Sequence, residues 1–552
     1  MRNDPWRAAL IGIAVATAVT LPGLGIGTLW DNSETAYGEV AREVLLYADP
    51  VVLHLNGAPW FVQPPLYFWI AAIFIKIFGL GTLALRLPAA LATIAIGAAS
   101  GYAVARVAGT RAGAFVAVIL STTLMQAIIG RLAIMDALLD GAVAATIFLW
   151  FRAIERGEGR AFAWGWVAAA FGVLAKGPVA IVIALMVIVP WAVWDHSSGI
   201  RLRWPSPRSW VIAAVAFLAI TMPWIILLEM REGGSALATL IGHYTVGRYL
   251  GTIENQTGPW FYYVPVVILG FFPWVAFLPA ALASSVRLLA ERTSDERLAS
   301  LHRLALVWAV VPFVFFSLAQ TKLPNYIALE LPALALLVAL WFDGIAESGL
   351  RRAALVSAAI VPITIGCIAF AIWRFSDSMH LSQQTRFVIP DLTFLGLAMF
   401  AGSIVTFVIL LRPDGARRAP YVLAATSVLT ILLIAFVAEP HAEPLKPIPQ
   451  LARVIATERR PDDAVAIQGV SGGNALLFYT APVVASINPP DDRTRNAADP
   501  KAVICAAPRA FVVTSLHRPA HDPSYGRRRT LIATAANDAL YLFDGPRCDN
   551  GV

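Results

Sequence analysis

Apolar stretches of membrane-spanning length follow one another from residue 8 to residue 438, with short polar breaks between them. An α-helix needs roughly 20 apolar residues to cross the hydrocarbon core of a bilayer. Of the 552 residues, 58% are hydrophobic and only 14% are charged, which is more apolar than a soluble domain can bury in its core. We therefore predict an α-helical polytopic membrane protein.

The first apolar stretch, residues 8 to 23, follows a short basic start, which is also how a signal peptide begins. Many apolar stretches follow it, and no convincing small-residue cleavage site is present. We therefore expect this stretch to be a retained first helix.

The C-terminal segment, residues 441–552, has the composition of a small globular domain. It contains the strand-sized apolar runs "DAVAIQGV", "RAFVVTSL" and "DALYLFDG", and the helical-looking segment "IPQLARVIATERR". We therefore predict a transmembrane domain at 1–440 and an α/β domain at 441–552. Cys505 and Cys548 in the second domain could form a disulfide if its compartment is oxidising, or could remain two free thiols.

The arginines predict the topology. Arg-rich breaks occur at residues 1–7, 106–111, 152–160, 201–208, 287–303, 351–352 and 412–418. Cytoplasmic loops carry an excess of Lys and Arg, so we expect these breaks to face the cytoplasm and the breaks between them to face outward. The net charge of +7 therefore reports topology rather than a nucleic-acid partner.

One apolar run, "PPLYFWIAAIFIKIFGLG" at residues 64–81, does not fit this alternation. It begins with two prolines and carries Lys76, and a cation in mid-span is costly. We expect an interfacial helix in a long outer loop, 24–82, and a second interfacial loop at 230–260. About 13 spans remain, with the N-terminus in the cytoplasm and the C-terminus outside.

Charged residues gather in the first predicted outer break, "LWDNSETAYGEVAREVL". Asp31 and Glu34 have the spacing of a capping box, so one interpretation is a helix start. Glu39 and Arg42 are three residues apart, which by default is an ion pair on a solvated helix face. The alternative interpretation is that the carboxylates act as general bases or hold a metal.

The next two outer breaks carry charges of both signs. Asp136 in "IMDALLD" could be the N-cap of the following helix, but Asp140, one turn further into the membrane, is harder to explain in that way. Lys176 in "LAKGPVA" could be a snorkelling lysine. A lysine on the outer side runs against the positive-inside bias, however, which favours a functional role.

Two later outer breaks add further candidates. "IGHYTVGRYLGTIENQTGPWFYYVP" contains Arg248, a candidate phosphate-binding residue, and His243, which we interpret as a loop histidine because no ligand spacing supports a metal. "LAQTKLPNYIALELP" places Lys322 and Tyr326 at a helix start and Glu330 one turn inside, where an acid is either functional or part of a structural ion pair. Carboxylates and cations on one side of a membrane suit the transfer of a group from a lipid phosphate carrier.

These motifs, together with "HLNGAPWFVQPPLYFW", "LRLPAAL" and "HYTVGRYLG", resemble the protein O-mannosyltransferase-like superfamily, and within it the bacterial aminoarabinose transferases of lipid A. The likeness extends from Leu29 to Leu337. It implies a GT-C glycosyltransferase of the bacterial inner membrane that takes a sugar from a polyprenyl phosphate on the periplasmic side. Relatives differ in metal use, so a divalent cation remains an open alternative.

The resemblance also implies roles for individual residues. The implied catalytic carboxylates are Glu34, Asp31 and Asp136. The implied donor-phosphate residues are Lys176, Arg248, Lys322 and Tyr326. The implied substrate-binding residues are Tyr37, Arg42, Arg86 and Gln63.

The chain departs from the family pattern at three positions. Ser33 stands where the family usually has an Asp before the Glu, Ala36 where an Arg precedes the Tyr, and Gln63 where a Lys precedes the Pro. A serine is not a carboxylate, so the catalytic base is expected to be Glu34 or Asp31.

We therefore expect an inverting transfer of a sugar from a polyprenyl-phosphate donor to a hydroxyl of an envelope lipid, glycan or protein. A transporter or flippase of lipid-linked sugars is a second function class, which predicts repeated halves and polar residues near the bilayer midplane. A catalytically degenerate relative that only binds lipid is a third, and the three departures keep it open.

Overall fold

The computed structural model describes residues 4–30, 33–252, 256–291, 293–348, 351–375, 383–481, 483–487, 497–516, 527–545 and 548. The chain divides into two compact units. Unit 1 comprises Met1–Leu24, Phe61–Tyr67 and Arg86–Val437, and unit 2 comprises Gly25–Trp60, Phe68–Leu85 and Ala438–Val552. The greater part of the long loop after the first helix is therefore grouped with the C-terminal segment.

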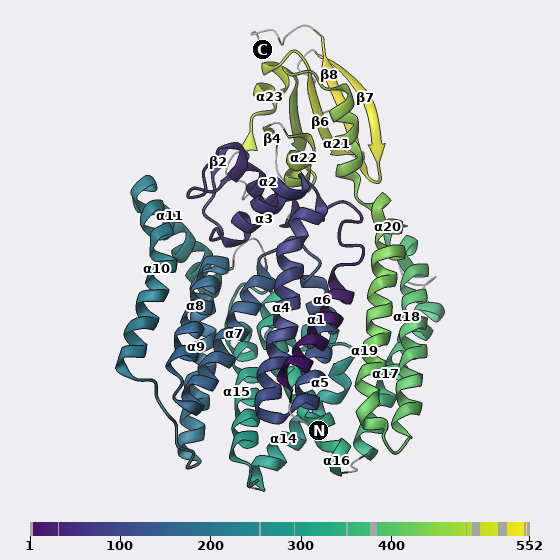
Figure 1. Ribbon diagram of the computed structural model, residues 1–552. Helices are drawn as coiled ribbons and strands as arrows, with labels where there is room; N and C mark the ends of the chain where they lie inside the picture. Colours follow the sequence, from purple (N-terminus) through teal and green to yellow (C-terminus); the bar gives the residue numbers. More distant parts are fainter. Residues whose placement is uncertain are drawn as a thin grey trace. The chain divides into compact units, whose positions relative to one another are not determined.

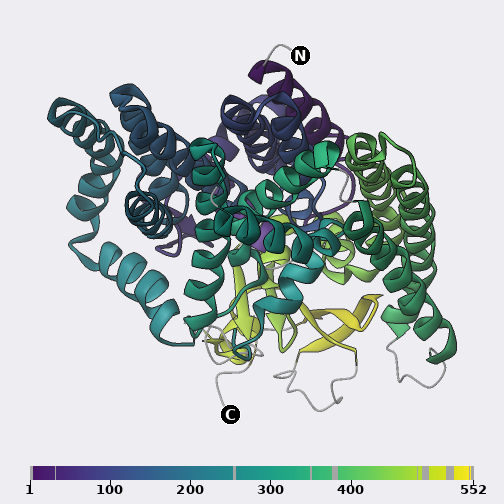
Figure 2. The ribbon, with the colours of Figure 1, turned by 90° about the horizontal axis from the view of Figure 1, so that it is seen from below.

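Unit 1 is helical. Its elements are α1 (Pro5–Thr20), α4 (Thr82–Ala108), α5 (Thr110–Ser121), α6 (Leu124–Ile129), α7 (Asp136–Arg156), α8 (Gly159–Lys176), α9 (Val179–Ser197), α10 (Pro207–Glu232), α11 (Ser235–Leu237), η1 (Ala238–Gly247), α12 (Arg248–Leu250), α13 (Tyr263–Gly270), η2 (Trp274–Phe277), α14 (Leu278–Ala290), α15 (Glu296–Leu318), η3 (Pro324–Glu330), α16 (Leu331–Ser348), α17 (Arg351–Phe375), α18 (Gln383–Leu410), α19 (Gly415–Leu433) and η4 (Ile434–Ala438). Helix α8 packs between α7 and α10, and α17, α18 and α19 lie side by side (Figures 1 and 2).

Glycines allow α1, α4 and α5 to approach one another closely. A Cβ on Gly113 of α5 would lie 2.4 Å from the backbone oxygen of Gly101 in α4, and a Cβ on Gly12 of α1 would lie 2.6 Å from that of Gly97. Small residues at helix contacts are typical of membrane bundles, where close packing of backbones replaces the hydrophobic effect. A larger residue at either position would force the helices apart.

Eight helices of the described residues are long and apolar enough to cross a membrane, or nine if the bent pair Tyr263–Gly270 and Trp274–Ala290 is one span. Shorter apolar helices occur at Pro5–Thr20, Leu66–Phe78, Thr110–Ser121 and Arg352–Ile368. The predicted polytopic helical class is confirmed. The finer count of about 13 spans stays a prediction.

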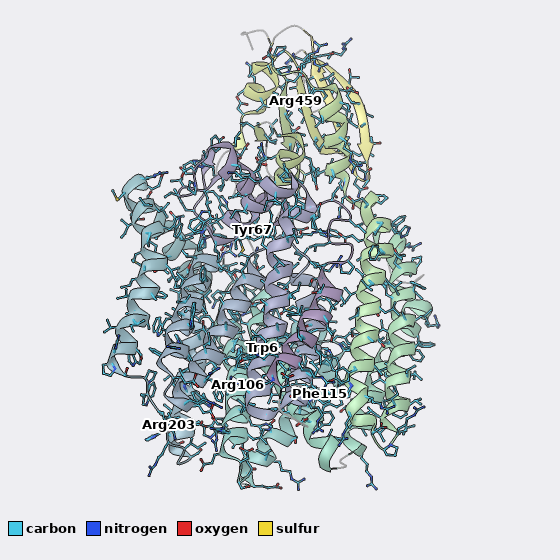
Figure 3. All side chains as sticks on the ribbon, viewed as in Figure 1. Trp6, Tyr67, Arg106, Phe115, Arg203 and Arg459 are labelled. Atoms are coloured by element: carbon cyan, nitrogen blue, oxygen red, sulfur yellow. A yellow bond between two sulfur atoms is a disulfide. The ribbon has the colours of Figure 1, made fainter. Side chains whose placement is uncertain are left out.

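Two arginines of the predicted cytoplasmic breaks lie toward one end of unit 1. Figure 3 shows Arg106 and Arg203 toward the same end of the helices, and Tyr67 toward the opposite end. The assignment of this end to the cytoplasm stays a prediction.

Unit 2 combines helices of the first loop with a mixed sheet. Its elements are α2 (Ser33–Leu46), β1 (His54–Leu55), β2 (Ala58–Pro59), α3 (Leu66–Phe78), α20 (Glu439–Ala442), η5 (Glu443–Leu445), α21 (Pro447–Glu458), β3 (Ala464–Gln468), α22 (Gly473–Thr480), β4 (Val484–Ile487), β5 (Ala497–Ala498), α23 (Pro500–Ala506), β6 (Ala510–Ser515), β7 (Arg528–Ala535) and β8 (Asp538–Asp544). Strands β3 to β8 form one sheet in the order β5-β4-β3-β6-β8-β7. The first four strands of this order are parallel, and β8 is antiparallel to both of its neighbours.

Alternating side chains give the sheet two apolar faces. Val465 and Ile467 of β3 pack in one core with Leu451 of α21, whereas Ala466 packs in a second core with Ile504 of α23. Successive residues of a strand point to opposite faces, so a central strand covered on both sides needs an uninterrupted apolar run such as "AVAI". The C-terminal segment is therefore a small domain with a mixed sheet, as the strand-sized runs predicted.

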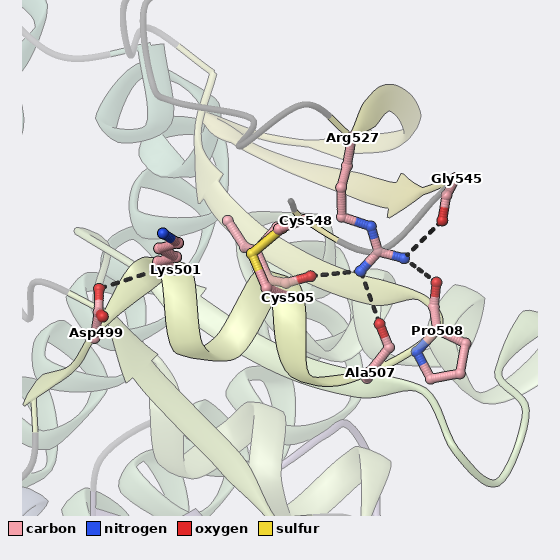
Figure 4. The surroundings of a disulfide bond; sticks show 9 residues. Asp499, Lys501, Cys505, Ala507, Pro508, Arg527, Gly545 and Cys548 are labelled. Atoms are coloured by element: carbon pink, nitrogen blue, oxygen red, sulfur yellow. Dashed lines mark hydrogen bonds between the residues drawn. A yellow bond between two sulfur atoms is a disulfide. The ribbon is translucent and has the colours of Figure 1, made fainter. Parts of the chain in front are cut away.

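The disulfide alternative is confirmed for the two C-terminal cysteines. Cys505 in α23 is bonded to Cys548 (Figure 4). Arg527 lies beside this bond and donates hydrogen bonds to the carbonyl oxygens of Ile504 and Ala507, the latter at 2.8 Å (Figure 4). A cation at a helix C-terminus satisfies carbonyl groups that have no partner within the helix, so Arg527 stabilises the end of α23.

Candidate active site

In unit 2, Glu34 lies in the first turn of α2 and is 1% exposed. Its Oε2 accepts a hydrogen bond of 2.8 Å from the backbone N–H of Trp30. In a capping box with Asp31 as the N-cap, Glu34 would accept from the Asp31 N–H, so the bond from Trp30 is a different contact, one residue further from the helix. Asp31, the alternative base, lies outside the described residues.

The second turn of α2 contains a buried ion pair. Arg42 donates to both carboxylate oxygens of Glu39, at 2.9 Å from Nε and 2.5 Å from the second nitrogen. Glu39 is fully buried, so the expectation of a solvated helix face is wrong here. In unit 2, strand β1 and helix α22 pack against α2. The spacing of two residues along one helix does not predict which distant segments pack against that helix. The hydrogen bonds that Arg42 donates to Glu39 raise the pKa of Arg42.

Glu43 shares this environment. Burial and a hydrogen bond with the Glu39 carboxyl raise the pKa of Glu43 to about 7, while the backbone N–H of Gly57, 3.2 Å from Oε2, acts in the opposite direction. Two carboxyls one turn apart with one shared cation favour retention of a proton. The sequence interpretation did not include Glu43 as a candidate, although its spacing of four residues from Glu39 is a readable signal.

Tyr37 lies on the same helix, within an aromatic cluster. Its ring makes edge contacts with Trp60 and Phe68, at centroid distances of 6.2 and 5.9 Å. Such edge-to-face pairs hold rings in defined orientations. The Tyr37 ring therefore packs α2 against the segments that contain Trp60 and Phe68.

In unit 1, Asp136 and Lys176 form a buried ion pair. Lys176 Nζ lies 2.5 Å from Asp136 Oδ1, and the two side chains are 15% and 6% exposed. Asp136 is the first residue of α7 and Met135 occupies the N-cap position, so the N-cap interpretation of Asp136 is wrong. Asn325 donates a second hydrogen bond, of 2.6 Å, to the same Asp136 oxygen.

Tyr326 links this pair to Arg248. The Lys176 ammonium lies 5.4 Å from the centre of the Tyr326 ring, and an Arg248 nitrogen lies 3.4 Å from the Tyr326 hydroxyl. The same Arg248 nitrogen donates to the Gln256 side chain, also at 3.4 Å. Unit 1 therefore brings residues from four predicted outer breaks into one polar cluster.

Backbone hydrogen bonds hold the Arg248 segment against the segment before Tyr326. Thr321 N–H donates to the Arg248 oxygen at 3.1 Å, and Lys322 N–H donates to the Gln256 oxygen at 2.9 Å. Asn325 and Gln256 were missed at the level of sequence. Each is an amide side chain in a predicted outer break that also contains a cationic residue, and this was the one feature of the sequence that could have indicated it.

The other predicted site residues of unit 1 make local contacts. Lys322 Nζ donates to the carbonyl oxygens of Ser317 and Ala319 at the end of α15, at 2.8 and 2.6 Å, and burial lowers its pKa. Arg86 is 1% exposed, and one of its nitrogens lies 3.4 Å from the Leu24 oxygen. Gln63 is half-buried in the turn before α3.

Two further buried acids and the loop histidine complete the predicted residues of unit 1. Asp140 and Glu330 are 3% and 1% exposed, and Oδ2 of Asp140 and Oε2 of Glu330 have no hydrogen-bond partner among the described residues. His243 is exposed and packs edge-on against Tyr244. Across the described ranges, no group of three or more His, Cys, Asp or Glu residues has a metal-binding arrangement.

Comparison with known proteins gives the class of this chain. Residues 62–227 match the family model described as dolichyl-phosphate-mannose-protein mannosyltransferase. An undecaprenyl phosphate-alpha-4-amino-4-deoxy-L-arabinose arabinosyl transferase of Edwardsiella ictaluri is 25% identical over 421 residues, which are 69% of this chain and 73% of that protein. The enzyme of the same name from Erwinia tasmaniensis is 30% identical over 374 residues, which are 66% of this chain and 64% of that protein.

Solved structures extend the likeness to the fold of the whole chain. The crystal structure of ArnT from Cupriavidus metallidurans bound to undecaprenyl phosphate matches with a TM-score of 0.80 and 22% identity, covering 98% of this chain and 99% of that one. The chain is thus a membrane glycosyltransferase with the GT-C fold. Its similarity to the mannosyltransferase family model covers residues 62–227, and its similarity to the aminoarabinose transferases covers about two thirds of the chain.

Proposed function

We propose that this chain transfers a pentosyl or hexosyl group from a polyprenyl-phosphate donor to a hydroxyl group of an envelope lipid, glycan or protein. The donor class is supported by the names of the relatives, which act on undecaprenyl phosphate-linked aminoarabinose. The polar cluster of unit 1 carries the proposal, because Lys176, Arg248 and Tyr326 are the residue types that bind phosphate oxygens.

In the proposed reaction, the acceptor oxygen attacks the anomeric carbon of the sugar while the bond to the phosphate oxygen breaks. The acceptor proton passes to a carboxylate, for which Glu34 and Asp31 are the candidates. The electron pair of the broken bond stays on the departing polyprenyl phosphate, whose charge the cations Lys176 and Arg248 stabilise. A single displacement of this kind inverts the anomeric configuration.

The other residues have supporting roles in the proposal. Asp136 holds the Lys176 ammonium, and Asn325 donates to the same Asp136 oxygen and so helps to fix that carboxylate. Lys322 stabilises the turn before Tyr326 through the end of α15. Further proposed substrate-binding positions are Tyr37, Arg42, Arg86 and Gln63. The described residues do not form a metal-binding group, so we assign no step to a divalent cation.

The proposal is tested by transfer of a labelled sugar from a polyprenyl-phosphate donor to an acceptor, catalysed by the purified full chain. Glu34→Gln retains a side-chain oxygen that can accept the Trp30 N–H, so it removes the base with little change in local structure. We expect turnover to fall about 10²- to 10⁴-fold in Glu34→Gln or in Asp31→Asn, whichever residue is the base. Full activity of both single variants and of the double variant would refute the assignment. Donor binding without turnover by the wild type would instead indicate a degenerate, lipid-binding relative.

We also propose that the protein resides in a bacterial inner membrane with about 13 spans, its N-terminus in the cytoplasm and its C-terminal domain in the periplasm. The Cys505–Cys548 disulfide supports this orientation, because disulfides persist in oxidising compartments. Reporter fusions at the two ends test it, and a cytoplasmic signal from the C-terminal fusion would reject the orientation.

A further inference from the structure

The backbone of residues 28–30, just before α2 and Glu34, forms hydrogen bonds with side chains of the C-terminal segment. Both carboxylate oxygens of Glu443 accept the Thr28 N–H, at 3.1 and 3.2 Å, and one of them also accepts the Thr28 hydroxyl. Lys446 Nζ donates to the Thr28 carbonyl at 2.8 Å and lies 3.2 Å from the second Glu443 oxygen. Every polar group of Thr28 is therefore bonded to a residue more than 400 positions away in the chain.

The next two residues continue the pattern. The Leu29 N–H donates to the Tyr479 hydroxyl at 2.8 Å, and the Trp30 N–H donates to Glu34 at 2.8 Å. The Lys446 ammonium lies 4.1 Å from the centre of the Trp30 ring, a cation–π distance. The backbone N–H groups of residues 28, 29 and 30 thus donate to three different side chains. The last of these acceptors is Glu34, the candidate base.

Gly27 shows how closely this arrangement fits. Its φ of +75° is in the left-handed region, and a Cβ would lie 3.1 Å from Glu443 Oε2 and 3.3 Å from Glu439 Oε1. Glycine is suited to such a position because it has no side chain and adopts positive φ without strain. The backbone therefore turns at Gly27 in close contact with the Glu443 carboxylate, a few residues before α2 and Glu34.

We propose that Glu443, Lys446 and Tyr479 are positioning residues for catalysis. Their hydrogen bonds fix the backbone of residues 28–30, and this backbone in turn fixes the orientation of Glu34. The C-terminal segment thereby holds the loop before α2 in place. The inference rests on the proposed function, in which Glu34 or its neighbour Asp31 accepts the acceptor proton. A general base must lie within hydrogen-bond reach of its proton, so small displacements of this loop lower the rate of the chemical step.

Tyr479→Phe is the sharpest test, because it deletes one hydroxyl and keeps the ring that packs against Phe478. We expect kcat for sugar transfer to fall about 3- to 10-fold, the equivalent of one hydrogen bond, with KM for the donor unchanged. Hydrogen exchange at the Leu29 amide should accelerate, and binding of undecaprenyl phosphate should stay at the wild-type level. Tyr541→Phe is the matched control: Tyr541 is in strand β8 of the same domain, where Arg529 covers its ring, and it should leave all of these values unchanged.

Lys446 gives a second, independent variant. Lys446→Met should lower kcat and accelerate amide exchange across residues 28–30, and Lys446→Arg should restore both in large part because the cation is retained. Wild-type kcat and exchange in Tyr479→Phe and Lys446→Met would overturn the positioning role. A loss of folded protein with normal turnover in the folded fraction would also overturn it. Absence of transfer by the wild type would overturn the proposed function, and full activity of the Glu34→Gln/Asp31→Asn double variant would overturn the assignment of the base. Either result would overturn the positioning role as well.

Discussion

Replacing Asp136 with Asn leaves the Lys176 ammonium without the carboxylate that lies 2.5 Å away. With side-chain exposures of 6% and 15%, both groups are largely removed from water. Loss of one partner of such a pair typically costs about 3–5 kcal/mol of unfolding free energy. Lys176→Met should cost less, about 2 kcal/mol, because Asn325 still donates to the Asp136 carboxylate at 2.6 Å.

The double variant Asp136→Asn/Lys176→Met removes both charges together. We expect it to be more stable than Asp136→Asn alone by about 2 kcal/mol, because neither member of the pair is left as a buried charge without its partner. Denaturant unfolding of the full chain in mixed micelles measures the three free energies, and labelled-sugar transfer measures the function. Transfer should stay low in the double variant even though stability recovers. Additive losses of stability would refute the reasoning, since they would mean that the two side chains are not energetically coupled.

Two other predictions concern unit 2. The raised pKa of Glu43, about 7 against an ordinary 4.5, means that the folded chain holds this proton more tightly than the unfolded chain, so its contribution to stability is complete below pH 4.5 and is lost as the pH rises through 7. Unfolding measured from pH 4 to 8 should show this loss in the wild type and not in Glu43→Gln; equal slopes would contradict it. Removing the Cys505–Cys548 bond, with a sequence separation of 43, should destabilise the C-terminal domain by about 4 kcal/mol through loop entropy. Thermal unfolding of Cys548→Ser with and without reductant checks this, and a reductant effect that persists in the variant would exclude the disulfide as its cause.

The sequence predicted many of the residues of the candidate site. It did not predict which of these residues contact one another. Asp136 and Lys176 were both expected on the outer side, and the structure pairs them across 40 positions of the chain. The N-cap alternative for Asp136 was wrong, and the Glu39–Arg42 pair forms but does not lie on the solvated face that was expected. Both expectations came from local spacing rules, which consider at most one turn of helix and cannot include what packs against that turn.

The sequence by itself determined the class of the protein, because membrane insertion depends on the length and hydropathy of each apolar stretch, and these are local sums. It also determined the two-faced strands of the C-terminal domain, because side-chain alternation is a property of each strand. Tertiary structure alone decided the partners of the charged groups: Asn325 for Asp136 across 189 positions, and Glu443 for Thr28 across 415. Such pairs depend on how distant segments meet after the helices have packed. The role of the C-terminal segment in holding the loop before α2 therefore became visible only in three dimensions.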